Sequence, residues 1–210
     1  MAAVLSIPER QVVLTGISWE TYRRLLSERE EQSGLHFTYD RGTLEIMVLS
    51  ARHEEPNRAL AALVEVLAEE LHVDIRRLGS TTFQREDLAR GFEADSCFYV
   101  QHVDAVAGKD EIDLGIDPAP DLVIEVDIAS ASINKLPIFA AVRIPEVWRY
   151  DGTRVHLLCL EGGRYRETTV SLVLPPLTGE IATRFLDDAR RLKSTEWLGR
   201  VRAWVRGLTA

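Results

Sequence analysis

Residues 120–128, PDLVIEVDI, constrain the fold of this chain more than any other segment. Their β-branched side chains, bounded by proline and small residues, are typical of a central buried strand. Residues at alternate positions of a strand share a face. One face of this strand is wholly apolar: Leu122, Ile124, Val126 and Ile128. The opposite face carries a line of acids with one valine among them: Asp121, Val123, Glu125 and Asp127.

The line of acids on this strand predicts a bound cation. Neighbouring carboxylates repel each other, and burial raises their pKa because the charged form loses its hydration. A hard divalent ion with oxygen ligands, Mg²⁺ or Mn²⁺, would compensate this charge. We therefore predict Asp121, Glu125 and Asp127 as candidate metal ligands. Two alternatives stay open, because Asp121 could cap a turn after a proline and Asp127 could be an ordinary exposed acid.

Two residues outside this strand extend the pattern. Lys135 follows Glu125 by ten positions, about one turn into the next predicted helix, from where its long side chain could return to the strand end. Asp95 lies in a second strand-like run at residues 91–100, GFEADSCFYV. Two carboxylates and a lysine suit phosphodiester hydrolysis, in which a metal lowers the pKa of an attacking water and the lysine stabilises negative charge. As alternatives, Lys135 could be a solvated helix residue and Asp95 a plain surface residue.

The remaining patterns predict how the rest of the chain is organised. Apolar residues at helical spacing predict helices at residues 18–31, with Ser18 as the N-cap, and at residues 53–71. Alternating runs around turn signals predict hairpins at residues 36–50 and 146–160. Strand-like runs at residues 73–87 and 91–100, a short helix before Pro145 and two helices beyond Thr178 complete the pattern.

These elements predict an α/β fold of the α+β kind. A central mixed β-sheet would lie between helices, with a helix and hairpin at the N-terminal end and helices at the C-terminal end. We expect one domain over residues 1–210, with its core at 12–177 and a helical tail at 178–210. The apolar face of the last helix, which carries Trp197, Leu198, Val201 and Trp204, would pack on this core or form a homodimer seam.

Composition excludes several classes of protein. With 46% hydrophobic and 28% charged residues the chain is globular, and its net charge of -8 excludes a generally basic nucleic-acid coat but not a local basic groove. No apolar run is long enough for a membrane helix, and the N-terminus lacks the pattern of a secretory signal. Cys97 and Cys159 suit ordinary core thiols in a reducing compartment. We therefore expect a cytoplasmic protein that has no membrane partner.

Several motifs occur in an order that resembles one known family. They are RGTLEIM, a helix that opens with His53 and Glu54, GFEADSCFYV, PDLVIEVDI, Lys135 and IPEVWRYDG. In this order they resemble the bacterial Uma-two family of "putative restriction endonucleases", long catalogued as a domain of unknown function. The resemblance extends from about Val12 to Trp204. It implies a restriction-endonuclease-like fold of the PD-(D/E)XK type.

The resemblance also implies roles for individual residues. Asp95 resembles the family's first metal-binding aspartate and Glu125 the glutamate of its second half-motif, while Lys135 resembles a lysine relocated from the strand to the following helix. Glu54 is similar to the acid that many such folds place on their first core helix, although an acid there also suits the helix dipole. The chain departs from the pattern at two positions: Asp127 replaces the usual lysine, and Ala94 replaces the proline before the first aspartate.

Together these features predict a Mg²⁺- or Mn²⁺-dependent endonuclease that cleaves DNA by metal-activated water, with Asp95, Glu125, Lys135 and Glu54 as catalytic residues. A homodimer would suit an enzyme that cuts both strands of a duplex. One alternative is an inactive descendant of the fold that binds nucleic acid or a protein, which the acidic charge favours. Another is a hydrolase of smaller substrates, but His36, His72, His102 and His156 stand singly and no nucleophile elbow is present.

Overall fold

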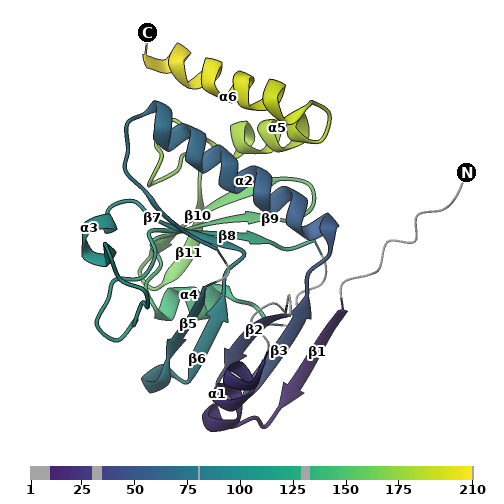
Figure 1. The fold of residues 1–210 in the computed structure, drawn as a ribbon, viewed down its shortest axis with the longest axis vertical. Coiled ribbons are helices and arrows are strands. Elements are labelled where there is room, and N and C mark those ends of the chain that lie inside the picture. The colour runs from purple at the N-terminus through teal and green to yellow at the C-terminus, as the bar shows by residue number, and fades with distance from the viewer. Residues whose placement is uncertain (1–9, 30–34, 80, 129–132, 210) are drawn as a thin grey trace, which may run out of the picture.

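The computed structural model describes residues 10–29, 35–79, 81–128 and 133–209. Within these residues the chain forms two β-sheets, each in contact with helices (Figure 1). Sheet A has the strand order β1-β3-β2-β6-β5, and all its pairings are antiparallel. Its strands are β1 (Arg10–Thr15), β2 (Leu35–Asp40), β3 (Thr43–Val48), β5 (Thr82–Arg85) and β6 (Arg90–Glu93).

Sheet B has the order β11-β10-β9-β8-β7-β4 and is mixed, because β8 and β9 pair in parallel. Its strands are β4 (Arg76–Leu78), β7 (Ser96–Tyr99), β8 (Leu122–Val126), β9 (Glu146–Tyr150), β10 (Val155–Glu161) and β11 (Arg164–Thr168). The helices are α1 (Trp19–Glu28), α2 (Ala51–Glu70), α3 (Val103–Val106), α4 (Leu136–Ala141), α5 (Gly179–Ala189) and α6 (Ser194–Thr209), with a 3₁₀ turn η1 (Glu86–Leu88).

The predicted mixed α/β class is confirmed, but the strands divide between two sheets instead of one. The run at residues 91–100 is not one strand: the chain leaves sheet A after Glu93 and enters sheet B at Ser96. The run at residues 73–87 divides in the same way, with β4 in sheet B and β5 in sheet A. Alternation alone cannot reveal such a crossing, because both halves of each run keep a strand-like pattern.

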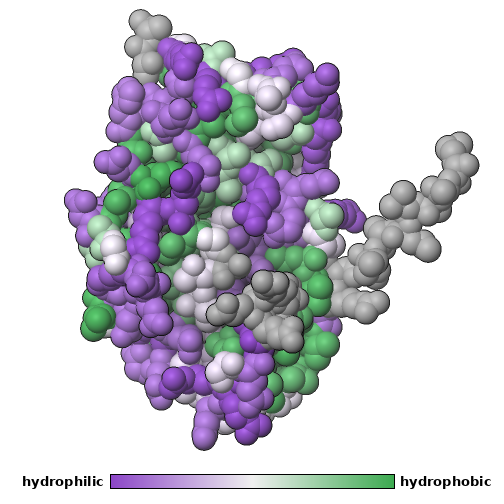
Figure 2. All heavy atoms as spheres, viewed as in Figure 1, coloured by the Kyte–Doolittle hydropathy of each residue, from purple (hydrophilic) through white to green (hydrophobic). Residues whose placement is uncertain are grey.

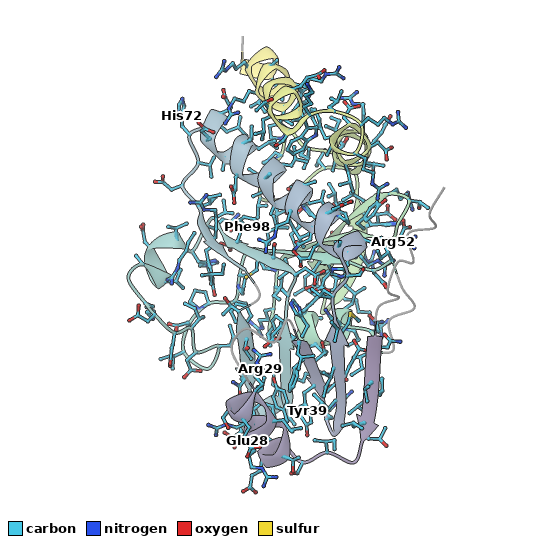
Figure 3. The ribbon with its side chains drawn as sticks, turned by 45° about the vertical axis from the view of Figure 1, so that its right-hand side comes forward. Glu28, Arg29, Tyr39, Arg52, His72 and Phe98 are labelled. Carbon is cyan, nitrogen blue, oxygen red and sulfur yellow. The ribbon has the colours of Figure 1, made fainter. Side chains whose placement is uncertain are left out.

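Helix α2 lies across one face of sheet B, and α5 and α6 pack near α2 (Figure 1). Figure 3 shows Arg52 at the N-terminal end of α2, His72 beyond its C-terminal end and Phe98 of β7 beneath the helix. The apolar face of β8 that the sequence predicts is buried in this core. Trp197 and Val201 of α6 are buried in the same cluster, so the last helix packs on its own core.

The other face of β8 packs against α4. Val123 of β8 and Val147 of β9 are buried together with Ile138 and Phe139 of α4. Because alternate residues share a face, Glu125 projects from this same side of sheet B, at the end of β8 where α4 begins. This arrangement places the strand end, the helix start and the crossing between the sheets in one region.

Strand β1 forms one edge of sheet A and leaves apolar side chains in solvent. Val12, Val13 and Leu14 are 54%, 40% and 38% exposed. Figure 2 shows hydrophobic surface at the lower right, on the side where Figure 1 places β1. In the part of the chain that the structure describes, no helix has the length and apolar character needed to cross a membrane.

Candidate active site at the junction of the two sheets

Lys135 and Glu125 form an ion pair between the start of α4 and the end of β8. Lys135 Nζ donates to Glu125 Oε2 at 2.7 Å. The two side chains are only 16% and 10% exposed. The lysine occupies the position immediately before α4, and its side chain reaches back to the strand, as the relocated-lysine prediction requires.

Asp95 lies at the crossing between the two sheets, and its carboxylate is directed at the end of β8. Its Oδ2 accepts a hydrogen bond from the backbone N–H of Val126 at 2.8 Å. His53 Nε2, from the first turn of α2, lies 3.3 Å from the same oxygen. Asn57, one turn further along α2, donates its Nδ2 to the backbone carbonyl of Asp95 at 3.2 Å. Helix α2 therefore fixes both the backbone and the carboxylate of Asp95.

The charges in this site strongly perturb one another. Burial raises the pKa of Glu125 to about 7, since the attraction of Lys135 is insufficient to offset both burial and the repulsion from Asp95. Burial alone would lower the pKa of Lys135, but the carboxylates of Glu125, Asp95 and Glu45 outweigh it and raise that pKa. Lys135 therefore stays protonated at neutral pH, whereas Glu125 gains or loses its proton close to pH 7. Shifts of this kind are typical of functional sites.

Sheet A contributes two further residues that the sequence did not single out as site residues. His36 Nδ1 of β2 lies 4.0 Å from Asp95 Oδ1, and burial lowers the pKa of His36 to about 4, so the ring is neutral at pH 7. Glu45 of β3 is 1% exposed and accepts from the backbone N–H of Ile133 at 3.1 Å. Glu45 could have been noticed, because it interrupts an apolar run as Glu125 does. A single histidine carries no comparable signal.

Two of the predicted site residues have other partners. The carboxylate of Glu54 pairs with Arg58, one turn further along α2, at 3.1 Å, while His53, its neighbour in sequence, contacts Asp95. Asp121 is wholly buried at the opposite end of β8 from Glu125. One of its oxygens accepts from the backbone N–H groups of residues 100, 101 and 102. His102 Nδ1 lies 2.6 Å from the other oxygen, so the Asp121 carboxylate is engaged by the backbone and His102 at the other end of β8 from Glu125, and a metal-binding role for it stays a prediction.

Asp127 lies immediately beyond β8. Its backbone N–H donates to the carbonyl of Tyr150 at 2.7 Å, which continues the pairing with β9 by one residue. Its side chain is half-buried. The structure thus brings together Asp95, Glu125 and Lys135, leaves Asp127 at the margin and separates Asp121 from them.

Comparison with known proteins identifies the family of this chain. A family model named Uma2, described as "Putative restriction endonuclease", matches residues 19–186, which is most of the chain. The chain belongs to the Uma2 family. No curated protein matches the sequence.

A solved structure supports the fold of this Uma2 protein. It is that of a chain from Anabaena variabilis, described as a putative nuclease belonging to DUF820. The two structures align with a TM-score of 0.50 at 11% sequence identity, over 81% of this chain and 99% of the other. At this identity the similarity shows a shared fold, so the chemistry has to be argued from the site itself.

The residues of the Uma2 site can be tested for their fit to the metal that such a fold implies. Glu125 Oε1 is buried and has no hydrogen-bond partner among the described residues, which leaves a carboxylate oxygen suited to a hard cation. Within those residues no group of three or more histidine, cysteine or acidic side chains is arranged as a metal site. Mg²⁺ commonly takes only one or two protein carboxylates, with water and substrate phosphate as its other ligands. Asp95 and Glu125 fit that kind of binding.

Proposed function

We propose that this Uma2 protein is a metal-dependent endonuclease that hydrolyses DNA phosphodiester bonds. The observation that carries the proposal is the placement of Lys135 on Glu125 at 2.7 Å, beside the aspartate that is fixed on the end of β8. Two carboxylates and a protonated lysine in a buried site are the groups that phosphodiester hydrolysis requires. The family's description supports the same class of reaction.

Each residue has a distinct role in this proposal. Asp95 and Glu125 would hold Mg²⁺ or Mn²⁺, an ion that polarises a phosphate and lowers the pKa of a bound water when it is present. Lys135 remains protonated and donates hydrogen bonds to the attacking water or to the developing negative charge on the phosphate. His53 positions the carboxylate of Asp95. Glu54 and Asp121 are not part of this machinery, because their carboxylates are engaged elsewhere.

A second candidate function is a nuclease-fold protein that binds nucleic acid or a partner protein without cleaving it. The net charge of -8 favours it, because a DNA-binding enzyme commonly carries a basic surface. Four of the C-terminal arginines have their charge offset by acids: Arg190, Arg200, Arg202 and Arg206 form ion pairs. A homodimer remains a prediction under either function.

The deciding experiment is cleavage of supercoiled plasmid and of single-stranded DNA and RNA by the purified protein. Reactions contain Mg²⁺, Mn²⁺ or EDTA, and Glu125→Gln and Lys135→Met variants are assayed beside the wild type. We expect cleavage only with metal, and its loss in both variants while circular dichroism and melting show that they remain folded. Glu54→Gln serves as the matched control, since it removes an acid on the same helix as His53 but outside the proposed machinery.

Two results would reject the enzyme. A folded wild-type protein that cleaves none of these substrates with either metal contradicts it, and so does cleavage that persists in the Glu125→Gln variant. In the first case, retention of labelled DNA without cleavage would favour the binding function. Cleavage of RNA alone would instead correct the substrate class.

A further inference from the structure

Arg149 is the neighbour of Glu125 on the adjacent strand. Strands β8 and β9 are parallel, and their register pairs Glu125 with Arg149. Paired residues of adjacent strands project from the same face of a sheet, and the strands lie about 4.8 Å apart. Val147, two residues before Arg149, packs against α4, so Arg149 and Glu125 both project from the α4 side of sheet B. The arginine therefore originates one strand away from the proposed catalytic glutamate.

Arg149 is half-buried, and the residues that the structure describes offer its guanidinium no acidic partner. Its Nε is buried without a hydrogen-bond partner, and within the described residues its guanidinium forms no ion pair at 4.0 Å or less. Glu125 pairs with Lys135 instead. On the other side, β10 pairs His156 with Arg149, and the histidine ring takes up the nearby acids, with Asp151 at 2.8 Å and Glu167 at 3.3 Å.

Arg29 shows the contrasting case of a shielded arginine that is paired with an acid. Arg29, also shielded from solvent, holds Glu93 through two hydrogen bonds, at 3.0 and 2.5 Å (its position is labelled in Figure 3). The chain contains 33 acidic residues, so a shortage of acids does not explain why the half-buried Arg149 has no carboxylate partner among the described residues. Shielding an unpaired charge from water costs free energy, and an arginine cannot avoid this cost by losing its proton, because its pKa is too high.

We propose that Arg149 binds a phosphate of the DNA backbone next to the scissile bond. A guanidinium is planar and its donors match two oxygens of a phosphodiester, so an oxyanion is the ligand that would satisfy it. Its place on β9 sets the substrate across the same sheet face as Glu125 and Lys135. This inference rests on the proposed function and adds to it a binding residue that the motif does not contain.

The test measures DNA affinity without cleavage. Binding of a fluorescein-labelled duplex is followed by anisotropy in EDTA, over a range of salt concentrations, for wild type, Arg149→Ala and Arg149→Lys. We expect Arg149→Ala to weaken binding about tenfold or more and to reduce the slope of log affinity against log salt by about one. Arg149→Lys keeps the charge and most of the side chain, so its DNA affinity should lie between those of wild type and Arg149→Ala. This variant should also stay folded if Arg149→Ala does not.

The control is Arg191→Ala, which removes an exposed arginine from the segment between α5 and α6. It should leave affinity and salt slope unchanged. Folded Arg149 variants with wild-type affinity and slope overturn the inference. If the variants lose affinity but the wild type cleaves nothing with metal, Arg149 still binds a backbone phosphate, while its place beside a scissile bond fails together with the enzymatic function. A wild type that binds no DNA overturns both.

Discussion

Lys135 Nζ and Glu125 Oε2 lie 2.7 Å apart although ten positions separate the two residues along the chain. The glutamate ends β8 and the lysine begins α4, so the pair joins two consecutive elements of the fold. In the usual arrangement, both residues would stand on one strand, where this chain has Asp127 at the lysine position. The ammonium group is therefore supplied from the helix, and an acid takes the vacated position.

The first prediction separates His53 from its neighbour Glu54. His53→Gln should lower Mn²⁺ affinity and cleavage by about 10- to 100-fold, because a group that orients a metal-binding carboxylate is commonly worth that much. Glu54→Gln should change both by less than about twofold, since its carboxylate pairs with Arg58 at the surface. Isothermal titration with Mn²⁺ and steady-state cleavage measure the two effects. The reverse order would restore Glu54 as the functional acid of α2.

Local patterns in the sequence account for the elements but not for their assembly. The alternation in residues 120–128 correctly predicts which face of β8 meets the core, and the hairpins and long helices are likewise confirmed. The division into two sheets was missed, since it depends on a crossing at Ala94 and Asp95 that leaves the local pattern intact. Strands β1 and β11 were also missed; the exposed valines of β1 give no clear alternation.

The site was predictable where a charge interrupts an apolar strand. Glu125 and Lys135 are identified by that signal and by the motif order, and the structure joins them. His36 was not predictable, because its approach to Asp95 arises only when sheet A folds against the end of sheet B. Asp121 carried the same signal as Glu125 but caps the backbone at residues 100–102, a role that is visible only in three dimensions.

The second prediction tests this structural role of Asp121. Asp121→Asn should lower the free energy of unfolding by about 1–3 kcal/mol, because a buried charged acceptor of several N–H groups is replaced by a neutral amide. Mn²⁺ affinity should be unchanged once folding is accounted for. Urea unfolding and Mn²⁺ titration of the same preparation measure both quantities. Loss of metal affinity without loss of stability would return Asp121 to the metal ligands.

The third prediction concerns stability and pH. In the folded protein the pKa of Glu125 is about 7, above its ordinary value of 4.5, because burial penalises the carboxylate. A raised carboxyl pKa favours the fold while the group is protonated, so this contribution is complete below pH 4.5 and is lost as pH rises to about 7. Glu125→Gln cannot titrate. The stability of wild type relative to this variant should therefore decrease between these values, by at most about 3 kcal/mol, and then level off.

Melting of both proteins in EDTA, in buffers from pH 4 to pH 8 (about half-unit steps suffice for one titration), measures this difference. Subtracting the variant removes the groups that titrate in both proteins, including the surface acids. A difference that stays flat over this range would show that Glu125 keeps its ordinary pKa in the folded protein, and that Lys135 fully compensates its burial.

The last prediction concerns the close contact of Gly91 with Tyr22. A Cβ at Gly91 would lie 2.1 Å from the hydroxyl oxygen of Tyr22 and 2.7 Å from its Cζ, and Tyr22 is fully buried and stacked on Tyr39 at 4.7 Å. Gly91→Ala should therefore cost about 1–3 kcal/mol of stability. The Tyr22 hydroxyl has no hydrogen-bond partner among the described residues, so Tyr22→Phe should be neutral or stabilising.

The double variant decides whether this contact is the cause. Removing the hydroxyl takes away the nearest of the clashing atoms, so Tyr22→Phe with Gly91→Ala should cost less than the sum of the single changes. Gly199→Ala in α6, where an added Cβ meets nothing within 4 Å, is the matched control and should raise stability by about 0.5–1 kcal/mol. Urea unfolding measures the change in the free energy of unfolding for each variant. If the changes of the two single variants add up to that of the double variant, the contact with the Tyr22 hydroxyl is not the cause, and the backbone at Gly91 is what requires a glycine.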